Sequence, residues 1–107
     1  MTQVELFAAL KTLGMPVTYG EFAQPTSPPF ITYQFYDDSG SIFADNQNYV
    51  AVDNFQVELY TNKKDLVKEK LVQDKLKELN LPYSKTETYL ESEKMRQVVY
   101  EIQLTGG

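Results

Sequence analysis

The chain has 107 residues, of which 42% are apolar and 23% charged, which is enough for one domain, spanning residues 1–107, with a modest hydrophobic core. Cysteine and histidine are both absent, which excludes disulfides, thiolate and imidazole metal ligands, cysteine nucleophiles and the usual general base at neutral pH. The net charge of −5 provides no basic field for a phosphate backbone, so we expect no direct nucleic-acid binding.

The beginning of the sequence lacks the cationic segment and the apolar run of a signal peptide. No stretch approaches the ~20 apolar residues that cross a bilayer. The sequence therefore predicts a protein that is made and kept in a cytoplasm, without a membrane partner.

A helix is predicted first, over Thr2–Leu13. Thr2 and Glu5 have the spacing of a capping box, in which each side chain accepts a hydrogen bond from the other residue's backbone amide. Apolar side chains follow at helical spacing, at Leu6, Leu10 and Leu13. Gly14 and Pro16 then end the helix, because neither residue favours its continuation.

The segment after this helix is rich in proline and predicts an extended chain. Val17–Tyr19 is compatible with a short strand, and a loop follows as far as Pro29. Phe30–Tyr36 alternates two sets of side chains and is dominated by β-branched and aromatic residues, which predicts a strand. Asp37–Ser41 has the composition of a turn.

The middle of the sequence contains one ambiguous segment and one clear strand. Residues 42–54 are compatible with a hairpin arm whose turn lies at Asp45–Asn48. Phe55–Thr61 alternates apolar with mainly polar side chains. One face of this strand is therefore expected to be buried, and the other to be wet or covered by a partner.

A second helix is predicted over Lys64–Leu79 and ends before Pro82. Its expected apolar face consists of Val67, Leu71, Val72, Leu76 and Leu79. The other face carries Glu69 and further acidic residues, interleaved with Lys63, Lys64, Lys68, Lys70, Lys75 and Lys77. We interpret this face as solvated and laced with ion pairs, not as a nucleic-acid patch.

Two strands close the chain, over Tyr83–Leu90 and Met95–Leu104, with a turn at Glu91–Lys94 between them. The last strand is expected to direct four side chains to one face, at Val98, Tyr100, Ile102 and Leu104. The elements together predict an α+β fold, namely a mostly antiparallel β-sheet with two helices packed on one face, plus an extended loop or hairpin arm.

No catalytic, cofactor or metal site is predicted. The neighbouring carboxylate pairs, Asp37/Asp38, Asp45/Asp53 and Glu91/Glu93, fall in expected turns, where carboxylates cap amides and stay solvated. Asp37–Ser41 lacks the ligand spacing of a calcium loop, and the glycines form no phosphate-binding pattern. We therefore expect a protein that is not an enzyme.

Two stretches carry apolar residues outside regular elements, the loop Tyr19–Pro29 and the arm Ile42–Val52. Either they fold back onto their own sheet or another molecule packs on them, because a small domain rarely keeps long irregular arms by itself. Eight tyrosines are compatible with an interface, since a tyrosine buries its ring and still offers a hydroxyl.

Nearly the whole chain follows one order of segments: a short N-terminal helix, a proline-containing stretch ending in Pro28–Tyr33, an arm, the strand Val52–Tyr60, the helix Asp65–Leu79 and a final hairpin ending in Tyr100–Leu104. This order resembles the tail-completion, or tail-terminator, proteins of long-tailed bacteriophages, which are also called tail-to-head joining proteins.

The resemblance implies a structural virion protein, made in the cytoplasm of a bacterial host, that assembles as a hexameric ring on the last ring of the tail tube. Such a ring stops tube growth and meets the head connector, while genome DNA passes through its hole without specific binding. The resemblance implies no cofactor and no catalytic residue.

Within this interpretation, the arm is the candidate for contacts between subunits, with Phe43, Tyr49 and Val50 as anchors. A lumen with negative charge does not retain passing DNA. The acidic residues that are candidates to face such a lumen are Asp37, Asp38, Asp45 and Asp53. Two alternatives stay open: another phage neck or minor capsid component, and a small ferredoxin-like binding or regulatory module.

Overall fold

The order of the helices and strands along the chain is close to the prediction. The structure, a computed structural model, describes residues 1–37, 42–43, 49–50 and 52–105. Its elements are α1 (Gln3–Lys11), β1 (Val17–Tyr19), β2 (Phe30–Asp37), β3 (Ile42–Phe43), β4 (Tyr49–Val50), β5 (Val52–Thr61), α2 (Leu66–Glu78), β6 (Ser84–Leu90) and β7 (Met95–Thr105).

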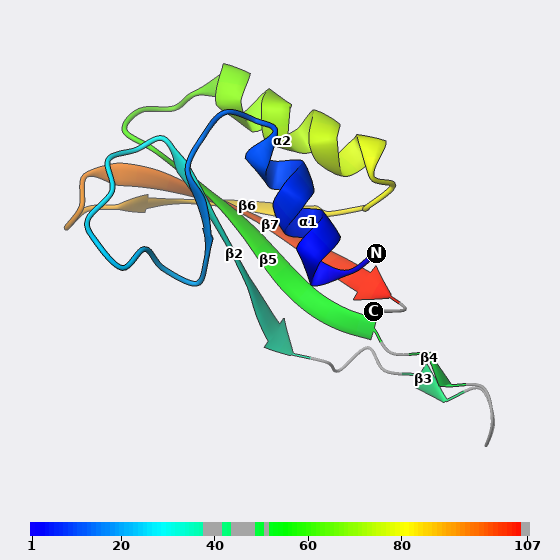
Figure 1. Cartoon of the computed structure of the whole chain (residues 1–107). Coiled ribbons are helices and arrows are strands. Elements are labelled where there is room, and N and C mark those ends of the chain that lie inside the picture. Colours follow the sequence, from blue (N-terminus) through cyan, green and yellow to red (C-terminus); the bar gives the residue numbers. More distant parts are fainter. Residues whose placement is uncertain (38–41, 44–48, 51, 106–107) are drawn as a thin grey trace.

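A five-stranded sheet carries both helices on one face (Figure 1). The strand order is β1-β2-β5-β7-β6, in which β1 runs parallel to β2 and the other neighbouring pairs are antiparallel. A second, two-stranded ladder joins β3 to β4. The predicted α+β class is therefore confirmed, with its mostly antiparallel sheet, two helices on one face and a hairpin arm.

Local hydrogen bonds set the start of α1 where the sequence predicts it. The Glu5 amide donates to Thr2 Oγ1 at 3.1 Å, and the Thr2 amide donates to Glu5 Oε1 at 2.8 Å, so the capping box is present. The helix ends at Lys11, two residues before the predicted Leu13. Gly14 follows with a φ of +83°, which only glycine adopts without strain.

The hydrophobic core lies between the two helices and the sheet. Its fully buried side chains are Leu6 and Leu10 of α1, Val72 and Leu76 of α2, and Ile31, Val57, Leu59, Val98, Tyr100 and Ile102 of the strands. Burial of such side chains contributes about 1.5–3 kcal/mol each, before the entropy cost of ordering the chain. The faces predicted to be buried on β5 and β7 are thus confirmed.

Strand β5 is longer than the prediction, because it begins at Val52 and not at Phe55. The whole of β5 pairs with β7, from Val52 opposite Thr105 to Thr61 opposite Arg96. This pairing is long-range and therefore leaves no signal in the polar residues around position 53. At the same end, Asp37 belongs to β2, and the rest of its predicted turn lies outside the described residues.

Helix α2 buries a different stripe from the one that its apolar residues suggested. Val72 and Leu76 are buried, but Val67 is 68% exposed and Leu71 is 37% exposed. Glu69, expected on the solvated face, is only 3% exposed. Glu69 is buried with Val72 and Leu76 because positions 69, 72 and 76 are spaced i, i+3, i+7 and therefore share one face of the helix.

The β3–β4 arm extends beyond the sheet, at the end opposite the loop that joins β1 to β2 (Figure 1). Phe43 pairs with Tyr49, and Ile42 with Val50. The predicted turn at 45–48 lies outside the described residues. The radius of gyration is 14.8 Å, whereas a compact domain of this length has about 13 Å, so the molecule is elongated.

Candidate interaction surfaces

Alternate residues of the sheet face away from the helices and form a polar surface, which we call the open face. It consists of Phe30, Thr32 and Gln34 on β2, Asn54, Gln56, Glu58 and Tyr60 on β5, Ser84, Thr86, Thr88 and Leu90 on β6, and Met95, Gln97, Val99, Glu101 and Gln103 on β7. Amides and hydroxyls predominate, and none of these residues is lysine or arginine. The cations of the chain therefore lie on the helices, in connecting segments or on the helix-covered side of the sheet.

Glu58 is buried on this face, at the centre of the sheet. Its side chain is held by β2, since Thr32 Oγ1 donates to Glu58 Oε1 at 2.6 Å and Gln34 Nε2 donates to Oε2 at 3.4 Å. Two similar hydrogen bonds cross from β7 to β5, Gln97 Nε2 to Tyr60 Oη at 2.9 Å and Gln103 Nε2 to Asn54 Oδ1 at 3.1 Å. Strand-to-strand bonds therefore fix the open face as a preorganised polar surface.

Strand β6 is the longer free edge of the sheet. It pairs with β7 on one side, and no described strand pairs with its other side. Its residues from Ser84 to Tyr89 are exposed, and only Leu90 is half-buried. An edge strand of seven residues without proline presents unpaired backbone groups on which another chain can add a strand.

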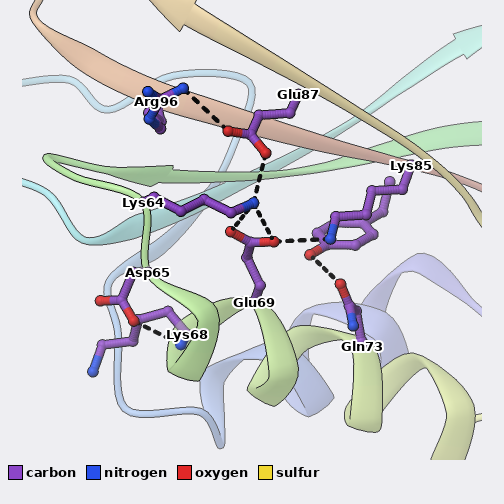
Figure 2. A network of polar contacts seen from close by, with 9 residues as sticks. Lys64, Asp65, Lys68, Glu69, Gln73, Lys85, Glu87 and Arg96 are labelled. Carbon is purple, nitrogen blue, oxygen red and sulfur yellow. Dashed lines mark hydrogen bonds and ion pairs between the residues drawn. The ribbon is translucent and has the colours of Figure 1, made fainter.

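Ion pairs, and not apolar packing, hold the helix side of β6 (Figure 2). Glu69 of α2 lies 2.8 Å from Lys64 Nζ and 2.8 Å from Lys85 Nζ. Glu87 of β6 lies 2.6 Å from Lys64 Nζ and 3.2 Å from Arg96 Nη1 of β7. Both charged side chains of β6 are therefore occupied within the chain, and its outer edge remains for a partner.

The cations near Glu69 lower the pKa of its carboxyl by more than burial raises it. Burial alone would raise the pKa of this carboxyl, but hydrogen bonds from Lys64 and Lys85 lower the pKa below its ordinary value. The pKa of Lys64 is raised, first by its hydrogen bond to Glu69 and then by that to Glu87. Glu69 and Lys64 are thus both charged at neutral pH, and the network joins α2 to the last hairpin.

The opposite edge of the sheet is partly closed by the chain itself. β1 covers only three residues of β2, from Ile31 to Tyr33. Beyond it, the Phe35 amide donates to Tyr19 Oη at 3.2 Å, so a side chain replaces the missing strand. The two edges of the sheet therefore differ, and β6 offers more free backbone.

Most of the residues predicted for subunit contacts and for the lumen have side chains outside the described part of the structure, so these assignments stay predictions. Phe43, Tyr49 and Val50 lie in the β3–β4 ladder, but their side chains are outside the described part of the structure. Asp38 and Asp45 lie outside the described residues, as does the side chain of Asp37. Asp53 is half-buried and pairs with Leu104, on the helix-covered side of the sheet.

Sequence reasoning missed Glu58 and Glu69, the two buried carboxylates among the described residues. For Glu69 a signal was present, namely its helical spacing to Val72 and Leu76. For Glu58 there was none, because its partner Thr32 is 26 residues away in the sequence.

Within the described ranges, no group of three or more histidine, cysteine, aspartate or glutamate side chains is arranged to hold a metal ion. Over the same ranges, the helices are too short or too polar to traverse a lipid bilayer.

Neither a protein-family model nor a curated protein matches this sequence. The fold is similar to that of a chain in the solved structure of the virion of a native gene transfer agent particle, with a TM-score of 0.60. The match covers 97% of this chain and 90% of the other, at 15% sequence identity. At this identity the likeness shows a common fold over almost the full length of both chains.

Proposed function

We propose that this protein is a structural component of a phage or prophage virion, and that it completes the tail by capping the tail tube as a ring and joining it to the head connector. The observation that carries the proposal is the fold shared with a chain of a gene transfer agent virion over 97% of this chain. A fold alone does not fix a function, so the surfaces of the molecule provide the second line of support.

Those surfaces suit head-to-tail contacts between identical subunits. The β6 edge and the β3–β4 arm are different structures at different places on the molecule (Figure 1). A ring needs two unlike patches, one on each neighbour, whereas a twofold dimer needs one patch that matches itself. In the proposed ring the arm of one subunit contacts the next subunit, and the free edge of β6 is available for an added strand.

The charge distribution suits a conduit for DNA. Because the open face carries no lysine or arginine, a lumen lined by it would not retain the phosphate backbone. Glu58 and Glu69, the buried carboxylates within the described part of the chain, are both held by hydrogen bonds or ion pairs, which supports a protein without catalytic activity.

Deletion of the gene from the phage or prophage that encodes it tests the proposal. We expect unjoined heads and tails, with tails of irregular length, and recovery when the intact gene is supplied. Normal infectious particles from the deletion strain would reject the proposal. Location of the tagged chain elsewhere in the particle would favour the alternative of another neck or minor capsid component.

Light scattering on the purified chain tests the ring itself. A hexamer of the 12.3-kDa chain has a mass of 6 × 12.3, about 74 kDa. Removal of residues 44–51 should abolish this species, whereas Glu91→Gln in the β6–β7 turn should leave it intact. A wild-type hexamer that survives the deletion would show that the arm makes no essential contact. A monomer or dimer that is also absent from particles would favour a small binding module.

A further inference from the structure

A hollow of about 460 Å³ lies on the open face, at the end of the sheet that loop 20–26 crosses. Thr32 and Tyr60 form its floor, Phe22 and its loop neighbours form one wall, and Met95 forms part of the other. The volume is within the range of about 300–1,000 Å³ that is typical of ligand sites. The ring contacts proposed above use the β6 edge and the arm, so they leave this hollow without a role.

Aromatic rings hold the loop against the sheet beside this hollow. Phe30 stacks on Tyr60 with ring centroids 4.7 Å apart and an angle of 24° between the planes. Phe22 of the loop meets Phe30 edge-on, with centroids 5.3 Å apart and an angle of 84°. These contacts join the loop to the sheet, and the three rings are among the residues that line the hollow. The face of an aromatic ring attracts an organic cation within about 6 Å of the ring centre.

The charge around the hollow has one sign. Glu21 and Glu93 are among the lining residues, and no lysine or arginine is. Lys94 follows Glu93 in the turn but does not line the hollow. The pKa of Tyr60 is raised, chiefly by burial and then by the charge of Glu58, with a contribution from Glu93. A negative potential thus reaches the floor of the hollow.

We propose that this hollow binds a lysine or arginine side chain on a segment of a second protein in the same assembly. The cationic group would lie near Glu21 and Glu93, and its aliphatic stem would pack on the rings of Phe22 and Tyr60. The arm of a second copy does not meet this requirement, because residues 42–54 contain no lysine or arginine. The partner is placed in a virion only through the proposed function; the chemistry of the site does not depend on it.

Binding is measured by NMR on the full chain, with a blocked tripeptide that has arginine at its centre as the probe. We expect saturable shifts of the ring signals of Phe22, Phe30 and Tyr60 and of the Met95 methyl. The same peptide with citrulline, which has the shape of arginine but no charge, should bind at least threefold more weakly. Loss of one exposed charge partner weakens binding by about two- to fivefold, so Glu21→Gln and Glu93→Gln should each do so.

Glu91→Gln is the matched control, since Glu91 lies in the same turn as Glu93 but does not line the hollow. Equal binding of both peptides, no saturable shift, or an equal effect of Glu91→Gln would overturn the proposal. So would shifts of these rings with protein concentration alone, which would assign the hollow to a second copy of the chain. The measurement uses the isolated chain, so a failed virion role and a failed site give different results.

Discussion

The hydroxyl of Tyr100, in β7, donates a 3.1 Å hydrogen bond to Oε1 of Gln73 on α2. The Tyr100 ring is fully buried and meets the Tyr83 ring edge-on, with centroids 5.2 Å apart. Burial raises the pKa of this phenol well above its ordinary value, with a smaller contribution from Glu69. This hydrogen bond therefore joins α2 to β7, in addition to the ion pair of Glu69 with Lys85 of β6.

Tyr100→Phe should lower the free energy of unfolding by about 1 kcal/mol, the usual contribution of one such hydrogen bond. Gln73 is only half-buried, so water can reach its amide and the cost stays at this level. Urea denaturation measures the change. Tyr89→Phe is the control, because Tyr89 is 48% exposed, and its effect should stay within about 0.5 kcal/mol.

The Glu69 network predicts a loss of stability in acid. The pKa of Glu69 is lowered in the folded chain, so its charge stabilises the fold above the unfolded pKa, near the ordinary value of 4.5. That contribution disappears as the pH falls below this value and through the folded pKa. The pKa of Glu5 is also lowered, by its hydrogen bonds with Thr2. The difference in unfolding free energy between wild type and a Glu69 variant isolates the contribution of the network.

Glu69→Gln should reduce the free energy of unfolding by about 2 kcal/mol at pH 7, since two cations lose a buried partner. Lys64 and Lys85 are partly exposed and can turn toward water, which keeps the loss below that of a fully buried pair. The gap from wild type should narrow below pH 4.5 in urea titrations. Asp74→Asn, which breaks the exposed Lys70–Asp74 pair, should have little effect. Equal losses in both variants would contradict the network's role.

The start of α1 depends on one hydroxyl. Thr2→Ala removes the acceptor for the Glu5 amide and should cost about 1 kcal/mol in urea denaturation. Thr2→Ser keeps the oxygen and should retain most of the stability. A loss as large in the serine variant would show that the methyl group of Thr2, and not its capping bond, is responsible.

Sequence reasoning succeeded where the determining contacts are local. The capping box of Thr2 and Glu5, the alternation in β2 and the final hairpin all lie within a few residues of their signals. It failed where the partner is distant in the sequence. The start of β5 is set by pairing with β7, about 50 residues away, and the burial of Glu58 depends on its hydrogen bond from Thr32. The exposure of Val67 has the same origin, because hydrophobicity gives the width of an apolar stripe and tertiary packing selects the part that is buried.

At the end of α2, backbone conformation alone decides whether a substitution of Asn80 raises or lowers the free energy of unfolding. Asn80 has a φ of +58°, the Leu81 amide donates to the Leu76 carbonyl at 2.9 Å, and the Asn80 amide donates to the Lys77 carbonyl at 3.0 Å. This is the Schellman arrangement, in which the left-handed residue is most often glycine. Asn80→Gly should therefore keep or raise the free energy of unfolding, whereas Asn80→Ala should lower it by about 1 kcal/mol. Asn62→Ala, in the exposed segment before α2, is the control for loss of an asparagine without this strain. If thermal melts place the glycine variant below the alanine variant, the Asn80 side chain, and not the left-handed backbone, determines the end of the helix.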